Sequence, residues 1–198
     1  MTRAAAALAA LLLVACASDG TTLRAPPPGV TAPPLTSTTV KNSATTTPGP
    51  LTLASPSFAP DGLVPVENTC DGENSSPPLT WGGVPEGTVE LAITVVDPDA
   101  SEAGFVHWVI ALIDPGVQAI AIGSVPDGAV EAMNSSGAAG YTGPCPPKGA
   151  APHHYVFTLY ALTSPSGVLA TMSGPDAIST LQRTAGLTTT LTATYQRA

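Results

Sequence analysis

The chain is poor in charged residues, and basic residues are the scarcest of them. Lysine and arginine together number 6 in 198 residues, against 14 aspartates and glutamates. From residue 51 onward, three basic residues stand against thirteen acidic ones, a net charge of minus ten. Nucleic acids require a positive surface, which this chain lacks. We therefore expect no nucleic acid partner. An anionic lipid surface would also repel this acidic chain, so attachment to a membrane has to rely on something other than charge attraction.

Patterns typical of enzymes and membrane-spanning proteins are also absent. There is no Gly-x-Ser-x-Gly turn for an activated serine, and no His-x-His or His-Glu-x-x-His spacing for a metal ion. The apolar run from Ala4 to Val14 is too short to cross a bilayer. We expect no catalytic residue, no enzyme activity, no cofactor and no metal. A metal site made of His107, His153 and Asp97 stays open as an alternative.

The first sixteen residues resemble a bacterial export signal. Arg3 supplies a positive start, an apolar stretch follows, and Leu13-Val14-Ala15-Cys16 is similar to the lipobox of lipoproteins. The resemblance implies a signal peptide over residues 1–15 and a lipid anchor, with acyl chains such as palmitate, on Cys16. It places the protein in the bacterial cell envelope, outside the cytoplasm and lipid-anchored to the membrane. A plain signal peptide that ends near a cysteine is the alternative.

Two further regions follow the anchor. Residues 16–50 are rich in threonine and proline and have no apolar periodicity, so we expect a disordered tether. Residues 51–198 suit one folded domain. Two cysteines, Cys70 and Cys145, fall in this domain, and in an oxidising compartment such a pair indicates a disulfide. Two separate buried thiols are the competing interpretation.

The domain is predicted to be mostly β. Strands are expected at 91–97, 105–113, 155–162 and 187–195, since each is apolar or β-branched and most end in turn residues. One helix is expected to begin at Pro175, with an apolar stripe reaching Ala185 and a stop at Gly186. Strict alternation along the strands would put His107 and Trp108 on opposite faces, and would send only one of His153 and His154 into a shared pocket.

The three histidines of the chain all lie in two short segments. One segment runs from Asp97-Pro98-Asp99 to His107-Trp108, and the other runs from the glycine- and proline-rich stretch 140–149 to His153-His154-Tyr155. Taken alone, each motif could be ordinary turn chemistry or a core histidine. Their concentration at strand ends predicts a single polar pocket.

These motifs, in this order, resemble the phosphatidylethanolamine-binding protein family, in its bacterial Raf kinase inhibitor-like group. The early loop from Cys70 to Asn74 and the segment from Ser76 to Trp81 also fit. The resemblance covers most of the domain and implies a sandwich of antiparallel sheets with short flanking helices. It also implies a small pocket for phosphate-type anions or phospholipid headgroups. The implied pocket residues are Asp97, Asp99, His107, Gly143, Pro144, Cys145, His153 and Tyr155.

Two positions depart from the family pattern. Ser101 stands where proline is usual, and His154 stands where arginine is common. A pocket with two aspartates could hold an anion through protonated histidines, through backbone N–H groups of the glycine-rich loop, or through a neutral aspartic acid. The resemblance also leaves a second function open: inhibition or regulation of a partner kinase or protease through the pocket rim.

Replacement of Cys16 tests the predicted anchor. If Cys16 carries the lipid, Cys16→Ala should move the protein from the membrane fraction to the soluble fraction, because the apolar anchor is lost. Fractionation followed by mass measurement of the mature N-terminus checks this. Unchanged fractionation together with an unchanged mass would refute the anchor.

Overall fold

The computed structural model describes residues 49–198. The signal peptide of residues 1–15, Cys16 and nearly all of the tether lie outside these residues, so those expectations stay predictions. No helix within 49–198 combines the length and the apolar character needed to cross a bilayer.

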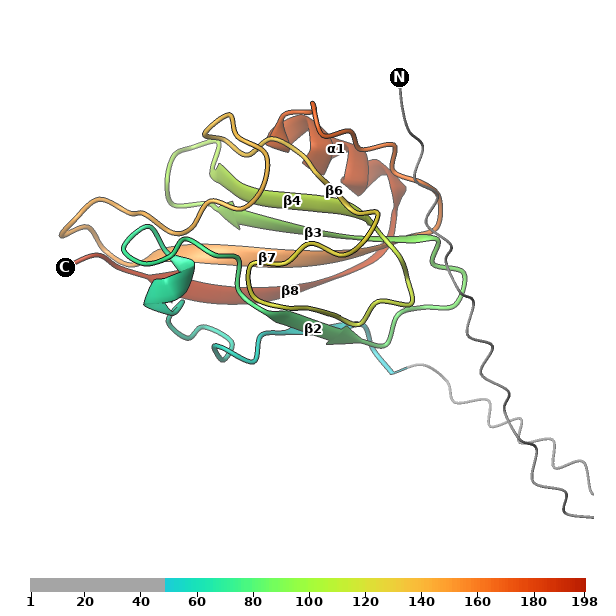
Figure 1. The fold of residues 1–198 in the computed structure, drawn as a ribbon, viewed down its shortest axis with the longest axis horizontal. Helices are drawn as coiled ribbons and strands as arrows, with labels where there is room; N and C mark the ends of the chain where they lie inside the picture. The colour runs from blue at the N-terminus through green and yellow to red at the C-terminus, as the bar shows by residue number, and fades with distance from the viewer. Residues whose placement is uncertain (1–48) are drawn as a thin grey trace, which may run out of the picture. The chain divides into compact units, whose positions relative to one another are not determined.

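Two antiparallel sheets make up the framework (Figure 1). The small sheet has the order β1-β2-β5 and the large one the order β6-β4-β3-β7-β8. The mostly β sandwich expected from the sequence is therefore confirmed. The elements are β1 (Thr52–Ala54), the 3-10 helix η1 (Val66–Asn68), β2 (Leu79–Gly82), β3 (Glu90–Asp97), β4 (Phe105–Ile113), β5 (Ala119–Ile120), β6 (Val130–Glu131), β7 (His153–Leu162), α1 (Gly174–Thr184) and β8 (Ala185–Tyr195).

The four long strands follow the predicted ranges, but the predicted helix end is wrong. α1 stops at Thr184, and Ala185 already has extended backbone angles, φ −66° and ψ 127°. Gly186 lies inside β8, where the pairing with β7 shifts by one residue. The prediction reached Ala185 because this residue continues the apolar stripe of the sequence. In the structure Ala185 is indeed partly buried against the same core as the helix. The strand pairing, which is not local, ends the helix earlier.

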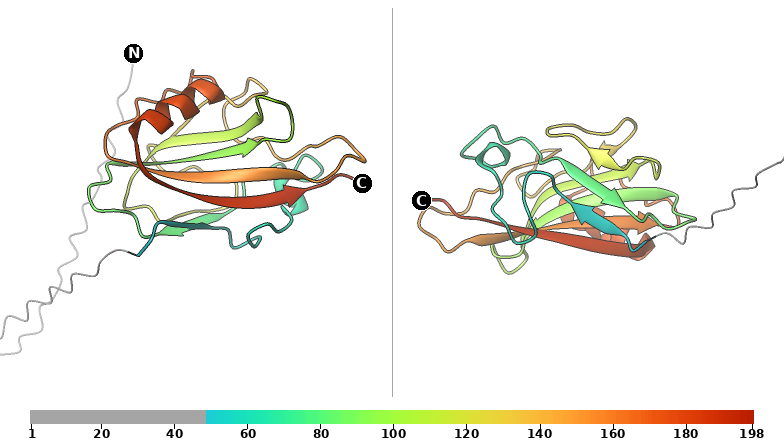
Figure 2. Two further views of the ribbon diagram at one scale, coloured as in Figure 1. Left: turned by 180° about the vertical axis from the view of Figure 1, so that it is seen from behind. Right: turned by 90° about the horizontal axis from the view of Figure 1, so that it is seen from below.

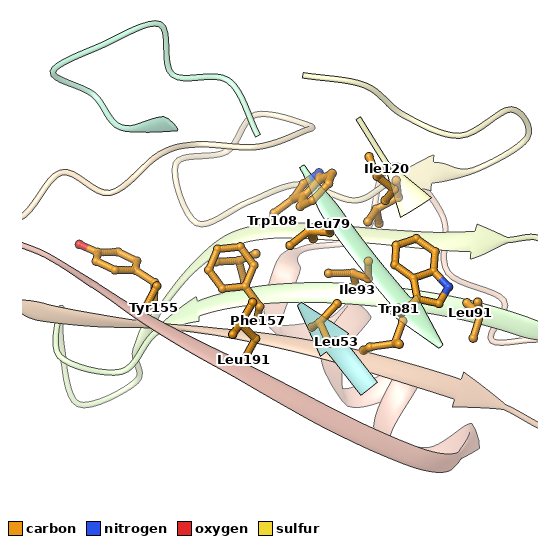
Figure 3. Close-up of a cluster of buried hydrophobic side chains, with 14 of the residues drawn as sticks. Leu53, Leu79, Trp81, Leu91, Ile93, Trp108, Ile120, Tyr155, Phe157 and Leu191 are labelled. Atoms are coloured by element: carbon orange, nitrogen blue, oxygen red, sulfur yellow. The ribbon is translucent and has the colours of Figure 1, made fainter. Parts of the chain in front are cut away.

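The core has two parts, one on each face of the large sheet. Between the two sheets, Leu53 and Trp81 of the small sheet meet Ile93, Phe157 and Leu191 of the large sheet (Figure 3). The opposite face packs against α1 (Figure 2) and forms the second part, whose members include Ala92, Val109, Ala111, Leu162, Ala177 and Leu181. Burial on both faces explains why β3 and β4 are nearly continuous apolar runs.

A disulfide joins Cys70 to Cys145, as the sequence predicted, with the two Cα atoms 5.4 Å apart. It links the loop after η1 to the proline-rich loop before β7. The next residue, Asp71, accepts hydrogen bonds from the Arg197 guanidinium and the Tyr195 hydroxyl, which hold the pKa of that carboxyl below its usual range. The loop after η1 is thus tied to both the 140–149 loop and the C-terminal residues.

The described chain begins and ends at opposite ends of the large sheet (Figure 1). Gly49 and Pro50 lie beside Leu187, near the start of β8. At the other end of β8, Tyr195 pairs with His153, and the Arg197 carbonyl accepts a hydrogen bond from the Gly149 amide. β3 points toward this second end, so Asp97 lies there and Glu90 does not.

Removal of the disulfide should destabilise the domain measurably. The bond closes a loop with a sequence separation of 75 residues. For such a loop the chain-entropy model gives about 4.5 kcal/mol, and removal of a native disulfide from a small domain typically costs roughly 2–5 kcal/mol. The double variant Cys70→Ser/Cys145→Ser should therefore unfold at lower urea concentration than the oxidised wild type. Reduced wild type is the control and should match the variant. Equal midpoints for oxidised wild type and the double variant would contradict the prediction.

Candidate functional site

A cavity of about 350 Å³ opens at the end of the large sheet where β3 finishes and β4 and β7 begin. This volume lies in the lower part of the range of small-molecule pockets. Six of the eight residues predicted from the sequence for a common pocket line it: four lie in the strands and the turn after β3, and Gly143 and Cys145 lie in its loop wall. The lining residues are Asp97, Asp99, Ala100, Phe105, His107, Thr142, Gly143, Cys145, Pro146, Pro147 and His153.

Asp97 organises the cavity floor. It is the last residue of β3 and is almost completely buried. Its Oδ1 accepts the backbone N–H groups of Asp99 at 2.8 Å and Ala100 at 3.1 Å, which fixes the turn after the strand. Its Oδ2 accepts from His153 Nδ1 at 2.8 Å. Both carboxylate oxygens are thus already engaged by the protein, so Asp97 acts mainly by holding the turn and the His153 ring.

The backbone of β4 bulges at His107, and this corrects the alternation argument. Val106 pairs with Val96 and Trp108 pairs with Val95, so β4 has one extra residue, His107, between these pairs. A bulge of this kind re-aims a side chain. As a result the His107 ring lies 5.2 Å from the Tyr155 ring, centre to centre, on the same inter-sheet side as Trp108 rather than on the opposite face.

The His107 ring is held from two directions. Its Nδ1 lies 2.6 Å from the Thr142 carbonyl oxygen, and the Phe105 ring packs against it with a centre-to-centre distance of 4.7 Å. A carbonyl oxygen can only accept, so Nδ1 carries the proton. Burial lowers the pKa of His107, although the Thr142 carbonyl and the Asp97 carboxylate oppose this shift. The free protein therefore favours the neutral ring.

Asp99 and His154 form a second, exposed pair at the rim. Asp99 Oδ2 accepts from both the backbone N–H of His154, at 2.7 Å, and its ring Nδ1, at 2.8 Å. These hydrogen bonds lower the pKa of Asp99. His154 does not line the cavity and its side chain is 55% exposed, whereas that of His153 is 13% exposed. The two neighbouring histidines thus point in different directions, as strand alternation predicted.

The loop wall offers fewer backbone donors than a glycine-rich loop suggests. The Thr142 N–H donates to the His107 carbonyl and the Gly143 N–H donates to Asn74 Oδ1. Positions 144, 146 and 147 are prolines, which have no N–H. Within 142–147 of the described chain, only the Cys145 N–H is uncommitted. A cradle of several backbone N–H groups is therefore not formed by this segment.

Two of the predicted site residues stand behind the cavity rather than on its surface. Pro144 is buried, and its carbonyl accepts from the Cys70 N–H. Tyr155 is fully buried, and its hydroxyl points toward the end of the sandwich, away from the other labelled core residues (Figure 3). That hydroxyl has no hydrogen-bond partner in the described part of the chain. Burial raises the pKa of Tyr155, so it stays protonated and can donate.

Sequence reasoning missed several lining residues. Phe105, Thr142, Pro146 and Pro147 line the cavity but were not proposed for it. Phe105 pairs with Asp97 across β3 and β4, so pairing the consecutive predicted strands 91–97 and 105–113 with each other would have located it. The prolines follow Cys145 directly, and the disulfide that carries them to the cavity was itself predicted. No group of three or more His, Cys, Asp or Glu residues within 49–198 is arranged to hold a metal ion.

Comparison with known proteins identifies the family. The family model described as phosphatidylethanolamine-binding protein matches residues 54–196, so the chain belongs to this family. It is 41% identical over 152 residues to the UPF0098 protein Rv1910c of Mycobacterium tuberculosis, an alignment that covers 77% of this chain and 73% of the relative.

Two further relatives are informative. A second protein of M. tuberculosis, named "Putative lipoprotein LppC", is 50% identical over 121 residues, but the match spans 59% of this chain and only 60% of LppC. The crystal structure of Escherichia coli YbcL, described as a member of the mammalian PEBP family, superposes with a TM-score of 0.71 at 34% identity. That match covers 75% of this chain and 99% of YbcL.

Gly143 should tolerate no side chain. A Cβ there would lie 2.6 Å from the Asn68 carbonyl oxygen and 2.7 Å from Asn74 Oδ1. We expect Gly143→Ala to destabilise the domain by roughly 1–3 kcal/mol, because the wall must move to relieve the overlap. Denaturant unfolding measures this. Gly82→Ala is the control, since its nearest neighbour would be Thr52 Oγ1 at 3.6 Å. Equal stability of the two variants would refute the packing argument.

Proposed function

We propose that the protein is a binding protein for small phosphate-type anions or phospholipid headgroups, which occupy the cavity at the end of β3. The observation that carries the proposal is the convergence of His107 and His153 on one cavity, each held in place through Nδ1 by a protein acceptor. These hydrogen bonds fix the orientation of both imidazole rings, and with it the positions of the two Nε2 atoms. Family membership supports the same class of ligand.

The electrostatics favour binding that involves protons. The cavity has two aspartates in its lining but no lysine or arginine among the described residues. An anion therefore gains attraction mainly when a histidine is protonated, and the nearby carboxylates stabilise that imidazolium. Of the three ways of holding an anion that the sequence left open, protonated histidines agree best with this lining.

We further propose that the protein binds without turnover and works at the cell envelope as a lipid-anchored protein. Support for binding without turnover is the lining itself, which has no serine and whose one cysteine is in a disulfide. The lipobox-like Leu13-Val14-Ala15-Cys16 and the name of the LppC relative support the location. Regulation of a partner kinase or protease stays a prediction.

Substitution of the histidines separates the proposed ligand groups from their neighbour. His107→Ala and His153→Ala should each weaken phosphate binding about tenfold or more, since a charge-assisted hydrogen bond is lost. His154→Ala should have a smaller effect because its ring bonds Asp99 outside the cavity. Isothermal titration calorimetry with inorganic phosphate measures all three. Loss of binding in His154→Ala with an unaffected His153→Ala would contradict this site.

Phosphate affinity should also fall as pH rises. The protonated ring binds the anion, so the affinity is highest below the pKa of the free ring and declines above it. For His107 this decline should begin below the ordinary histidine pKa, about 6.5, because burial lowers its pKa. NMR titrations across pH would show it. A flat profile, or hydrolysis of a phosphoester that stops on mutation of these residues, would overturn the proposal.

A further inference from the structure

The free nitrogen of His107 is a hydrogen-bond acceptor that faces the cavity. Nδ1 donates to the Thr142 carbonyl, so in the neutral ring Nε2 has a lone pair and no proton. Nε2 has no partner among the described residues, yet it is not one of the buried unpartnered atoms. His107 is only 4% exposed overall, and it lines the cavity. Nε2 therefore keeps some accessible surface, and the opening that His107 lines is this cavity.

The other groups around the pocket do not supply a proton to Nε2. Asp97, on β3, accepts three hydrogen bonds, and Asp99, in the turn after it, accepts two from His154. On β7, His153 donates Nδ1 to Asp97, so its neutral form also leaves Nε2 as an acceptor. The Tyr155 hydroxyl is buried behind the cavity and does not line it. An unprotonated Nε2 is thus left without a donor unless the ligand brings one.

We propose that the pocket selects oxyanions that still carry an acid proton, namely inorganic phosphate or a singly ionised phosphomonoester, over sulfate and phosphodiesters. The inference rests on the proposed function and specifies the ligand class of that site. A phosphate O–H donates to His107 Nε2, while the other phosphate oxygens accept from donors of the pocket. No covalent bond changes in this step.

Sulfate and diesters meet the same nitrogen without a proton. The lone pair of Nε2 then faces a lone pair of the anion's oxygen, and a buried acceptor left without a donor costs free energy. The alternative is uptake of one proton from solvent onto Nε2, and burial opposes this uptake. Both affinities should fall as pH rises, as the proposed function requires, but sulfate affinity should fall more steeply, because phosphate keeps a proton of its own that the neutral Nε2 can accept. The ratio of the two affinities is the property that identifies this arrangement.

The test compares four probes by calorimetry with the full chain: inorganic phosphate, sulfate, dimethyl phosphate and glycerophosphoethanolamine. At slightly alkaline pH, phosphate should bind the pocket roughly tenfold or more tightly than sulfate does, and the two affinities should converge as the solution becomes acidic. Dimethyl phosphate should be as weak as sulfate. Glycerophosphoethanolamine, a diester that represents the lipid source, should also be weaker than phosphate.

Two variants sharpen the test. His107→Asn replaces the titrating ring with an amide that can donate, so the ratio of phosphate to sulfate affinity should lose its pH dependence. Arg183→Ala, on the exposed side of α1, should keep the wild-type ratio. The wild-type ratio is decisive by itself if His107→Asn does not fold.

The outcomes separate the inference from the proposed function. If phosphate and sulfate bind equally at all pH values, or if glycerophosphoethanolamine equals phosphate, the selectivity is refuted while anion binding stands. If none of the four probes binds, both the proposed function and the inference fail. A ratio that rises with pH in wild type and is flat in His107→Asn supports the inference.

Discussion

The structure of the pocket depends on one buried carboxylate at the end of a central strand. Asp97 ends the strand that lies between β4 and β7 and is almost completely buried, and its oxygens take protein N–H donors on both sides. An unpaired charge at this depth would be costly. The hydrogen bonds that avoid this cost turn the chain sharply after β3 and lock the His153 ring. The same constraint therefore shapes the floor of the cavity and orients one of the two histidines that line it.

Most of the framework could be predicted from sequence because the long strands are apolar on both faces and are bounded by turn residues. β3 and β4 are examples, and α1 has a proline near its start. The short strands β1, β2, β5 and β6 could not be predicted. With two to four residues each, they carry too little periodicity, and they form only through pairing with neighbours that are distant in the chain.

The site was predictable in its residues more than in its geometry. His107, His153 and Asp97 do converge. However, local alternation put His107 on the wrong face, because a bulge is a property of two paired strands and not of one. The glycine-rich loop likewise suggested an N–H cradle, yet its prolines and its bond to Asn74 remove most of the donors. The free N–H donors of a loop can be counted only when the hydrogen-bond partner of each N–H group is known.

The placement of the chain's entry has a consequence for how ligands could reach the protein. Gly49 enters beside the start of β8, whereas the cavity lies beyond the far end of that strand, about 33 Å away for the ten steps between its eleven residues at roughly 3.3 Å each. The described chain therefore enters the domain at the end opposite the cavity, and its first residues, Gly49 and Pro50, leave the opening uncovered. A ligand would reach the opening without passing the described start of the chain.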